Sequence, residues 1–178
     1  MSYIYGLDLS MSDTGITIFD GEKPVFVGSI ATKDTKTHGE RLKEIYDFLL
    51  FLKEKYPPSV VCIERGFTRF NKSTQVVYRV VGIVNMLFYD IEQIYYSPKQ
   101  VKASLVDGKA SKEDLSNKIN EMYPDIIFKN NDESDAFAIV LTYLKLRGDD
   151  TSGCKQLKKK QIQSNKSRNR KNNKSRKS

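Results

Sequence analysis

The chain has few cysteines and no long apolar run, and these two shortages restrict the cellular compartment and the kind of protein that we expect. Two cysteines, Cys62 and Cys154, cannot form a disulfide framework, and Cys62 lies within an apolar strand pattern. This favours a reducing, cytoplasmic compartment. No apolar segment approaches the length of a membrane span, so we expect no membrane partner. The N-terminal Met-Ser-Tyr-Ile-Tyr also lacks the basic and apolar regions of a signal peptide.

Acidic residues are missing from the C-terminal part of the chain. From Lys155 onward there are eleven lysines or arginines and no acid. The rest, Met1 to Cys154, carries −3 although the whole chain carries +8. The tail is a low-complexity mixture of Lys, Asn, Ser, Gln and Arg, which predicts disorder. We expect one folded domain over residues 1–150, long enough to bury a substantial core, and a disordered basic tail over residues 151–178.

Apolar patterning predicts a mixed sheet. Short β-rich runs come first, and the turn residues between them indicate an antiparallel meander. Helical and strand patterns then alternate, which predicts an α/β fold with a mixed five-stranded sheet flanked by helices on both faces. The first, fourth and fifth strands should run parallel. The predicted strands cover residues 3–8, 15–20, 24–30, 60–64 and 93–96, and the predicted helices cover 39–55, 73–89 and about 132–147, with two shorter helices beginning near Pro98 and Ser111.

Four carboxylates stand at the ends of apolar segments. Asp8 and Glu64 each close a predicted strand, and Asp132 and Asp135 open the last predicted helix. Because the carboxyl ends of parallel strands meet at one edge of a sheet, these groups are expected to converge. The two aspartates at i and i+3 share a helix face, where the positive end of the helix dipole helps hold them together. Hard divalent cations such as Mg²⁺ need an all-oxygen site of this kind, and this many carboxylates could hold two ions.

Four short motifs follow one another along the chain. They are Gly-Leu-Asp-Leu-Ser-Met-Ser-Asp-Thr-Gly at residues 6–15, Ile-Glu-Arg-Gly-Phe at residues 63–67, a basic segment at residues 101–112, and Asp-Glu-Ser-Asp-Ala-Phe-Ala-Ile at residues 132–139. In this order they resemble the first strand and turn, the second motif, the basic helix–loop–helix segment and the final motif of the RuvC family of Holliday-junction resolvases, within the RNase H-like nucleases. Arg65 and Ser10 depart from the usual pattern, standing where a polar amide and a Pro or Gly-type turn residue are common.

The resemblance implies an RNase H-like fold and a structure-selective endonuclease that cleaves four-way DNA junctions by two-metal-ion phosphodiester hydrolysis. Paired Mg²⁺ or Mn²⁺ ions roughly 4 Å apart would activate a water and stabilise the leaving 3′-oxygen. Asp8 would bridge both ions, with Glu64 and Asp135 on one side and Asp132 on the other. Glu133 faces elsewhere on the helix, so we expect it to be solvated.

The resemblance also implies a homodimer packed through the helix over residues 73–89. The apolar stripe of this helix is wider than one core face needs, and Gly82 would permit close approach. The alternative is a fully buried internal helix.

Residues around the motifs are candidate DNA contacts. Phe67, an aromatic three residues beyond Glu64, would stack on an unpaired base at a branch point, although a loop aromatic folded onto the core is the alternative. Basic side chains would neutralise backbone phosphates, and for each of them a solvated side chain is an equal alternative. The resemblance places Lys102 and Lys112 at the DNA backbone. The complete set of candidates is Phe67, Arg69, Lys72, Lys102, Lys109 and Lys112.

Three other functions fit parts of the pattern. Actin-like sugar kinases share a strand–Asp–Thr-Gly phosphate loop, but they need two such domains, for which this chain is too short. A DNA- or RNA-binding module with an inactive RNase H-like core conflicts with the full acidic set, because crowded like charges are costly without a metal. A related nuclease acting on flaps, forks or DNA–RNA hybrids is the main alternative. His38, the only histidine, precedes a helix and is interpreted as a capping or surface residue rather than a base.

Overall fold

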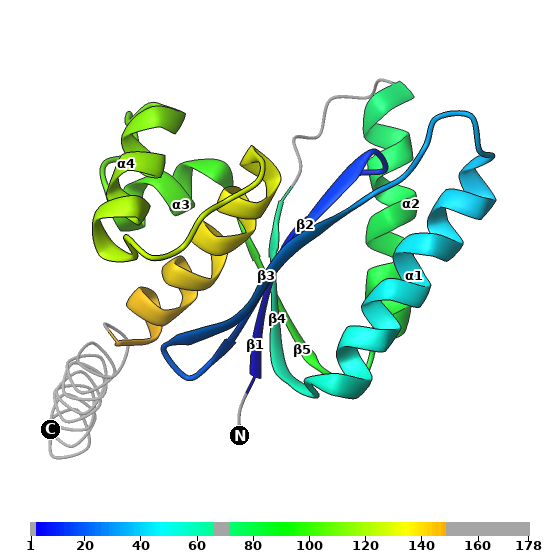
Figure 1. The fold of residues 1–178 in the computed structure, drawn as a ribbon, viewed down its shortest axis with the longest axis horizontal. Helices are drawn as coiled ribbons and strands as arrows, with labels where there is room; N and C mark the ends of the chain where they lie inside the picture. Colours follow the sequence, from blue (N-terminus) through cyan, green and yellow to red (C-terminus); the bar gives the residue numbers. More distant parts are fainter. Residues whose placement is uncertain (1–2, 66–71, 149–178) are drawn as a thin grey trace, which may run out of the picture. The chain divides into compact units, whose positions relative to one another are not determined.

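A five-stranded mixed sheet forms the centre of the fold (Figure 1). The computed structural model describes residues 3–65 and 72–148. The strand order across the sheet is β3-β2-β1-β4-β5. The first three strands pair antiparallel, whereas β1, β4 and β5 run parallel, so the predicted fold class is confirmed. The strands are β1 (Tyr3–Asp8), β2 (Asp13–Asp20), β3 (Lys23–Ala31), β4 (Pro58–Glu64) and β5 (Glu92–Tyr96).

Helices α1 (His38–Lys55) and α2 (Lys72–Leu87) cover one face of the sheet (Figure 1). Thr37 begins α1 with a capping box, in which its hydroxyl accepts from the Glu40 N–H and the Glu40 side chain accepts from the Thr37 N–H. Apolar residues spaced three or four apart on each helix point at the sheet and exclude water from it. The buried cluster on this face includes Tyr5, Leu7, Val61, Ile63, Ile45, Leu49, Leu52, Val80, Val84 and Leu87.

The opposite face of the sheet carries helices α3 (Pro98–Leu105) and α4 (Lys112–Met122) and residues 131–143 of a helix that covers residues 131–148 (Figure 1). Ser97 and Ser111 cap α3 and α4, each with a complete capping box, as the Ser-Pro and Ser-Lys-Glu-Asp sequences predict. Phe137 anchors the 131–148 helix, because its ring packs edge-on against Phe19 of β2 at 5.0 Å between ring centroids.

Two glycines let the 131–148 helix lie directly on the sheet. A Cβ at Gly6 of β1 would stand 2.3 Å from the Ala136 carbonyl oxygen, and a Cβ at Gly15 of β2 would stand 1.9 Å from the Asp132 carbonyl oxygen. Any side chain at either position would push the helix away. The glycines of the first motif therefore fix how closely the helix that carries Asp132 approaches β1 and β2.

Two compact units divide the chain, Met1–Tyr143 and Leu144–Ser178. All five strands and α1 to α4 belong to the first unit. Of the second unit, residues 144–148 are described and are helical, so the predicted tail over residues 151–178 lies outside the described residues. Among residues 3–65 and 72–148, no helix has the length and apolar character that a membrane crossing requires.

Candidate active site

The ends of β1 and β4 bring Asp8 and Glu64 to the same edge of the sheet. The strands are neighbours, with Leu7 paired to Ile63, so the residues that follow this pair leave the sheet side by side. Asp8 also pairs with Gly15 of β2, on which the Asp132 backbone lies. Strand pairing and the absence of a side chain at Gly15 thus place the start of the 131–148 helix beside Asp8.

The start of the 131–148 helix is tied to the sheet by Asn130. Its side-chain oxygen accepts from the Glu133 N–H at 2.9 Å, as a helix cap does. Its amide nitrogen donates to Asp13 Oδ2 at 2.9 Å and to Ser29 Oγ at 3.1 Å. One side chain therefore caps the helix and fixes its first turn against β2 and β3.

Asp8 is the carboxylate whose pKa is raised by the charges of the other three candidate ligands. Burial and the charges of Glu64, Asp135 and Asp132, in that order, raise the pKa of Asp8 to about 7, while Lys112 opposes the shift. An isolated aspartate has a pKa near 4, so the fold holds a carboxyl group where its charge is costly. A cation near Asp8 would remove this cost.

Glu64 and Asp132 share the same environment. Burial and then Asp135 raise the pKa of Glu64 to about 7, against the opposing charges of Lys112 and Lys102. Burial, Asp13 and Asp135 raise the pKa of Asp132. The other three carboxylates predicted from the sequence therefore all lie within electrostatic range of Asp8, and Asp135 also acts on Glu64 and Asp132.

Lys112 is the cation that reaches into this acidic cluster. Its Nζ donates to Asp135 Oδ2 at 2.8 Å, although the Lys112 side chain is 72% exposed. The hydrogen bond from Lys112 to Asp135, together with the charges of Asp135, Asp8 and Glu64, raises the pKa of the lysine. A side-chain ammonium thus partly neutralises acids that come from three separate elements.

The four carboxylates have the donor chemistry that a hard divalent cation requires. They offer only oxygen, they are partly or largely shielded from water, and they already attract an ammonium group. Within the described residues, no three His, Cys, Asp or Glu side chains stand close enough together to form a preformed metal-binding group. The residues fit a divalent cation by charge and donor type.

Arg41 supports the turn that follows Asp8, and sequence reasoning missed it. This arginine on α1 is only 8% exposed, and its guanidinium donates to Thr32 Oγ1 at 2.7 Å and to the Met11 carbonyl at 3.1 Å. Thr14 closes the same turn by donating to the Ser10 carbonyl at 2.5 Å. Nothing in the helical pattern around Arg41 signals this role, because its partners lie 9 and 30 residues away.

The other predicted residues fall in different places. Phe67 and Arg69 lie outside the described residues, and Lys72 is the first residue of α2, with its side chain outside them. Lys102 lies close enough to Glu64 to lower its pKa, whereas Lys109 is exposed between α3 and α4. His38 is exposed at the start of α1, as predicted for a surface residue.

The prediction that Glu133 is solvated is wrong. This residue is 3% exposed, and its carboxylate accepts from the Lys129 N–H at 2.8 Å. Glu133 does face away from the cluster, but the loop before the helix covers that side. Glu133 therefore holds the loop in place.

Comparisons with known proteins agree with this fold. The family model described as crossover junction endodeoxyribonuclease RuvC matches residues 4–143. A RuvC protein from Prochlorococcus marinus subsp. pastoris is 32% identical over 155 residues, which cover 82% of this chain and 98% of that protein. A RuvC protein from Ehrlichia ruminantium is 31% identical over 153 residues, covering 79% and 95%.

Solved structures share the architecture at lower identity. Thermus thermophilus RuvC in complex with a Holliday junction substrate superimposes with a TM-score of 0.72 at 19% identity, covering 82% of this chain and 95% of that one. The yeast mitochondrial Holliday junction resolvase Ydc2 gives a TM-score of 0.61 at 16% identity, covering 88% and 84%. With a family model that spans most of its length and relatives above 30% identity, the chain belongs to the RuvC family of crossover junction endodeoxyribonucleases.

Proposed function

We propose that this chain is a metal-dependent endonuclease that cleaves four-way DNA junctions. The observation that carries the proposal is the buried acidic cluster around Asp8, set at the strand ends of a RuvC-family fold. The names of the relatives favour four-way junctions over flaps, forks and DNA–RNA hybrids. Because the chain belongs to this family, the sugar-kinase alternative is excluded.

Asp8, Glu64, Asp132 and Asp135 are the proposed metal ligands. Nucleases of this family depend on divalent metal ions, and we infer two ions, Mg²⁺ or Mn²⁺, for this chain. When bound, such ions supply an activated water and positive charge at the leaving 3′-oxygen. Asp8 suits the bridging position, because it is the only member of the set whose pKa all three others raise.

Lys112 and Lys102 would then act on the DNA. Lys112 is largely exposed and bonds only Asp135 among the described residues, so its ammonium is free to turn toward a phosphate. Lys102 is partly buried, and its charge lowers the pKa of Glu64. Both lysines would hold a phosphate over the carboxylates and offset their repulsion. Phe67, Arg69, Lys72 and Lys109 remain proposed DNA contacts.

A homodimer through α2 is part of the proposal. The apolar stripe that motivates it from the sequence is largely core, since Val80 and Val84 are fully buried and Val76 and Val81 pack against the same core. The outer face of α2 carries different apolar residues, with Tyr78 51% exposed and Met86 62% exposed. Gly82 lies between them, and a Cβ there would meet nothing within 4 Å.

No neighbour within the described chain requires a glycine at position 82, where alanine would favour the helix by roughly 0.5–1 kcal/mol. An approaching helix of a second copy would require it. A groove of about 310 Å³ between α1 and α2, lined in part by Leu42, Tyr46, Ile83 and Met86, adds apolar surface beside this face. A dimer would place two active sites on one junction.

The direct test is a panel of labelled DNA substrates incubated with the full-length protein and Mg²⁺ or Mn²⁺. Four-way junctions should be cut, while linear duplexes, flaps, forks and DNA–RNA hybrids are cut much more slowly. Cleavage should stop when a chelator is present. If a hybrid or a flap were cleaved faster than a junction, the proposed substrate would be wrong.

A further inference from the structure

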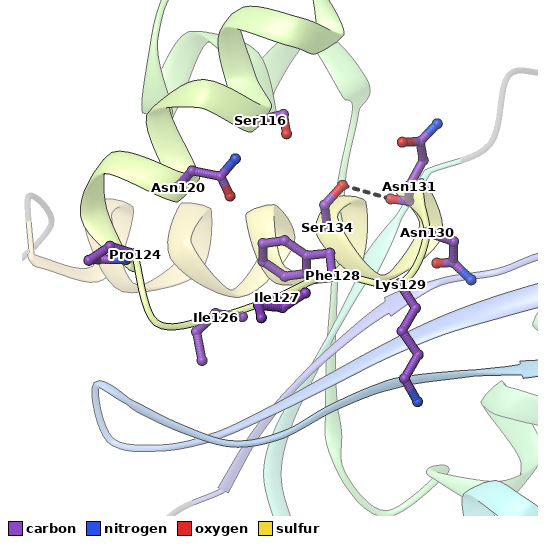
Figure 2. A pocket seen from close by; sticks show the side chains of 10 residues that line it. All are labelled: Ser116, Asn120, Pro124, Ile126, Ile127, Phe128, Lys129, Asn130, Asn131 and Ser134. Carbon is purple, nitrogen blue, oxygen red and sulfur yellow. Dashed lines mark hydrogen bonds between the residues drawn. The ribbon is translucent and has the colours of Figure 1, made fainter.

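Asn130 joins the start of the 131–148 helix to two strands of the sheet. Figure 2 shows this residue at the turn that leads into the helix, with its side chain directed toward the strands. Its side-chain oxygen accepts from the Glu133 N–H, and its amide nitrogen donates to Asp13 of β2 and to Ser29 of β3. Both hydrogens of this amide are therefore used to fasten the helix to the sheet.

Packing alone would not fix where this helix lies along the sheet. A Cβ at Gly15 would stand 1.9 Å from the Asp132 carbonyl oxygen, so the glycine sets how closely the helix approaches β2. A glycine offers no side chain that would resist sliding along the strand. Asp13 lies two residues before Gly15 on the same face of β2, and Ser29 of β3 pairs with Gly15. The two hydrogen bonds that Asn130 donates thus hold the helix at two points around the glycine.

Asp13 is a costly acceptor for this link. Its Oδ2 accepts from the Asn130 amide, but its Oδ1 is shielded from water and accepts no hydrogen bond within residues 3–65 and 72–148. No ion pair engages Asp13 in the same part of the chain. A neutral acceptor would make the link without leaving a shielded carboxylate oxygen unsatisfied. A carboxylate accepts a shorter and stronger hydrogen bond, so this fold gives up stability for a firmer hold on Asn130.

The link lies beside the proposed metal ligand Asp132. This residue follows Asn130 by two positions, in the first turn of the helix. The charge of Asp13 raises the pKa of Asp132, and it does so more strongly than the charge of Asp135. Among the described residues, no hydrogen bond engages the Asp132 carboxylate, whereas Lys112 holds that of Asp135. The place of the Asp132 carboxylate therefore depends on the backbone that Asn130 fastens.

We propose that Asn130, anchored by Asp13, is the positioning residue of Asp132 and thereby sets how tightly the four carboxylates bind divalent metal ions. The inference rests on the proposed function, because it takes Asp132 as a metal ligand. Side chains that hold a metal ligand in place typically change metal affinity or activity by roughly 10–100-fold when they are replaced. Neither Asn130 nor Asp13 needs to contact the metal or the DNA for this effect.

Titration calorimetry of the full-length protein with Mn²⁺, in the absence of DNA, tests this role. Asn130→Ser keeps an oxygen that can cap the helix, but its single hydroxyl cannot also bridge Asp13 and Ser29. Mn²⁺ binding should weaken about tenfold or more. Asp13→Asn keeps an acceptor for the Asn130 amide and loses the stronger, charged bond, so the loss should be smaller. Asn131→Ser, the same substitution at an exposed neighbour, is the matched control and should bind Mn²⁺ as the wild type does.

Melting curves in chelator distinguish positioning from stability. A link that only stabilises the fold would lower the Tm of Asn130→Ser and leave its Mn²⁺ affinity unchanged, and that result would overturn the proposal. A loss in Asp13→Asn equal to or larger than that in Asn130→Ser would also overturn it, because the charge and not the link would then be responsible. Should Asn130→Ser not fold, Ser29→Ala removes one of the two anchoring bonds, and an unchanged Mn²⁺ affinity there would count equally against the proposal. A wild type that bound no Mn²⁺ would instead refute the proposed carboxylate site, and this inference with it.

Discussion

The Asp8 carboxyl titrates near neutral pH because burial and three acidic neighbours act on it together. Its pKa in the folded protein, about 7, lies above its ordinary value of 3.8. The folded state therefore binds this proton more tightly than the unfolded state does. Without metal, the free energy of unfolding should fall as the pH rises from about 4 to about 7, and Glu64 should act in the same direction.

Melting curves in chelator measure this effect. The melting temperature at pH 8 should lie roughly 5 °C or more below that at pH 5, and millimolar Mg²⁺ or Mn²⁺ should reverse the loss at pH 8, where ions do not compete with protons. Asp8→Asn should flatten the pH dependence. The double variant Asp132→Asn, Asp135→Asn should lose the response to metal. Equal metal shifts in this variant and the wild type would contradict a carboxylate site.

Asp8→Asn should reduce junction cleavage by about a hundredfold or more while binding stays equal or becomes tighter. The substitution keeps the size of the side chain and removes the charge that the metal ions need. Removing a negative charge cannot weaken the attraction for phosphate. Single-turnover cleavage and binding in chelator separate the two effects, and cleavage within tenfold of the wild type would refute the role of Asp8.

For single residues, the sequence predicted the carboxylates and named Lys102 and Lys112 near them, but it did not predict the contacts that these groups make. Asp8 and Glu64 are visible because each ends an apolar run. The ion pair of Lys112 with Asp135 spans 23 residues and depends on how α4 packs, which no local pattern encodes. Arg41 is hidden for the same reason, since its partners Thr32 and Met11 lie in loops outside its own helix. Glu133 is buried by the loop just before its own helix, which the helical pattern does not reveal.

Element boundaries were predicted well because local chemistry sets them. The expected start after Ser111 is the observed start of α4, where the serine hydroxyl and Asp114 form a capping box. The expected helix over residues 73–89 corresponds to α2, Lys72–Leu87. The interpretation of its apolar stripe required the structure. A valine on a helix can pack on the core of its own chain or on a partner, and only its burial in the structure distinguishes the two.

Substitution of Gly82 tests the dimer at the level of this helix. Gly82→Arg should convert the protein to a monomer in sedimentation at micromolar concentration, because the long side chain would block a second helix. The fold should survive, since a Cβ at this position meets nothing within 4 Å. Asn117→Arg is the charge-matched control and should keep the dimer, because Asn117 is an exposed residue of α4, which covers the opposite face of the sheet (Figure 1). A wild type that sediments as a monomer would refute the dimer.

Charge is divided unevenly along the whole molecule. Residues 1–154 carry −3, while the eleven basic residues from Lys155 onward raise the total to +8. An acidic body is not attracted to DNA at long range, so its recognition must depend on a local basic patch near the carboxylates, to which Lys112 and Lys102 contribute. The tail can attract any phosphate backbone without reading sequence or shape.

Deleting Lys155–Ser178 should therefore weaken binding to linear duplex and to junction alike. The slope of the logarithm of the binding constant against the logarithm of the salt concentration should become shallower by several units. Each phosphate that the tail neutralises contributes about 0.9 to this slope. Preference for the junction should persist or increase, since the tail adds affinity to every DNA equally. Binding from low to moderate salt measures both quantities, and an unchanged slope would show that the tail takes no part in DNA binding. If the preference for junctions disappeared with the tail, selection of structure would lie outside the folded body, and the assignment of Phe67, Lys102 and Lys112 as junction contacts would be wrong.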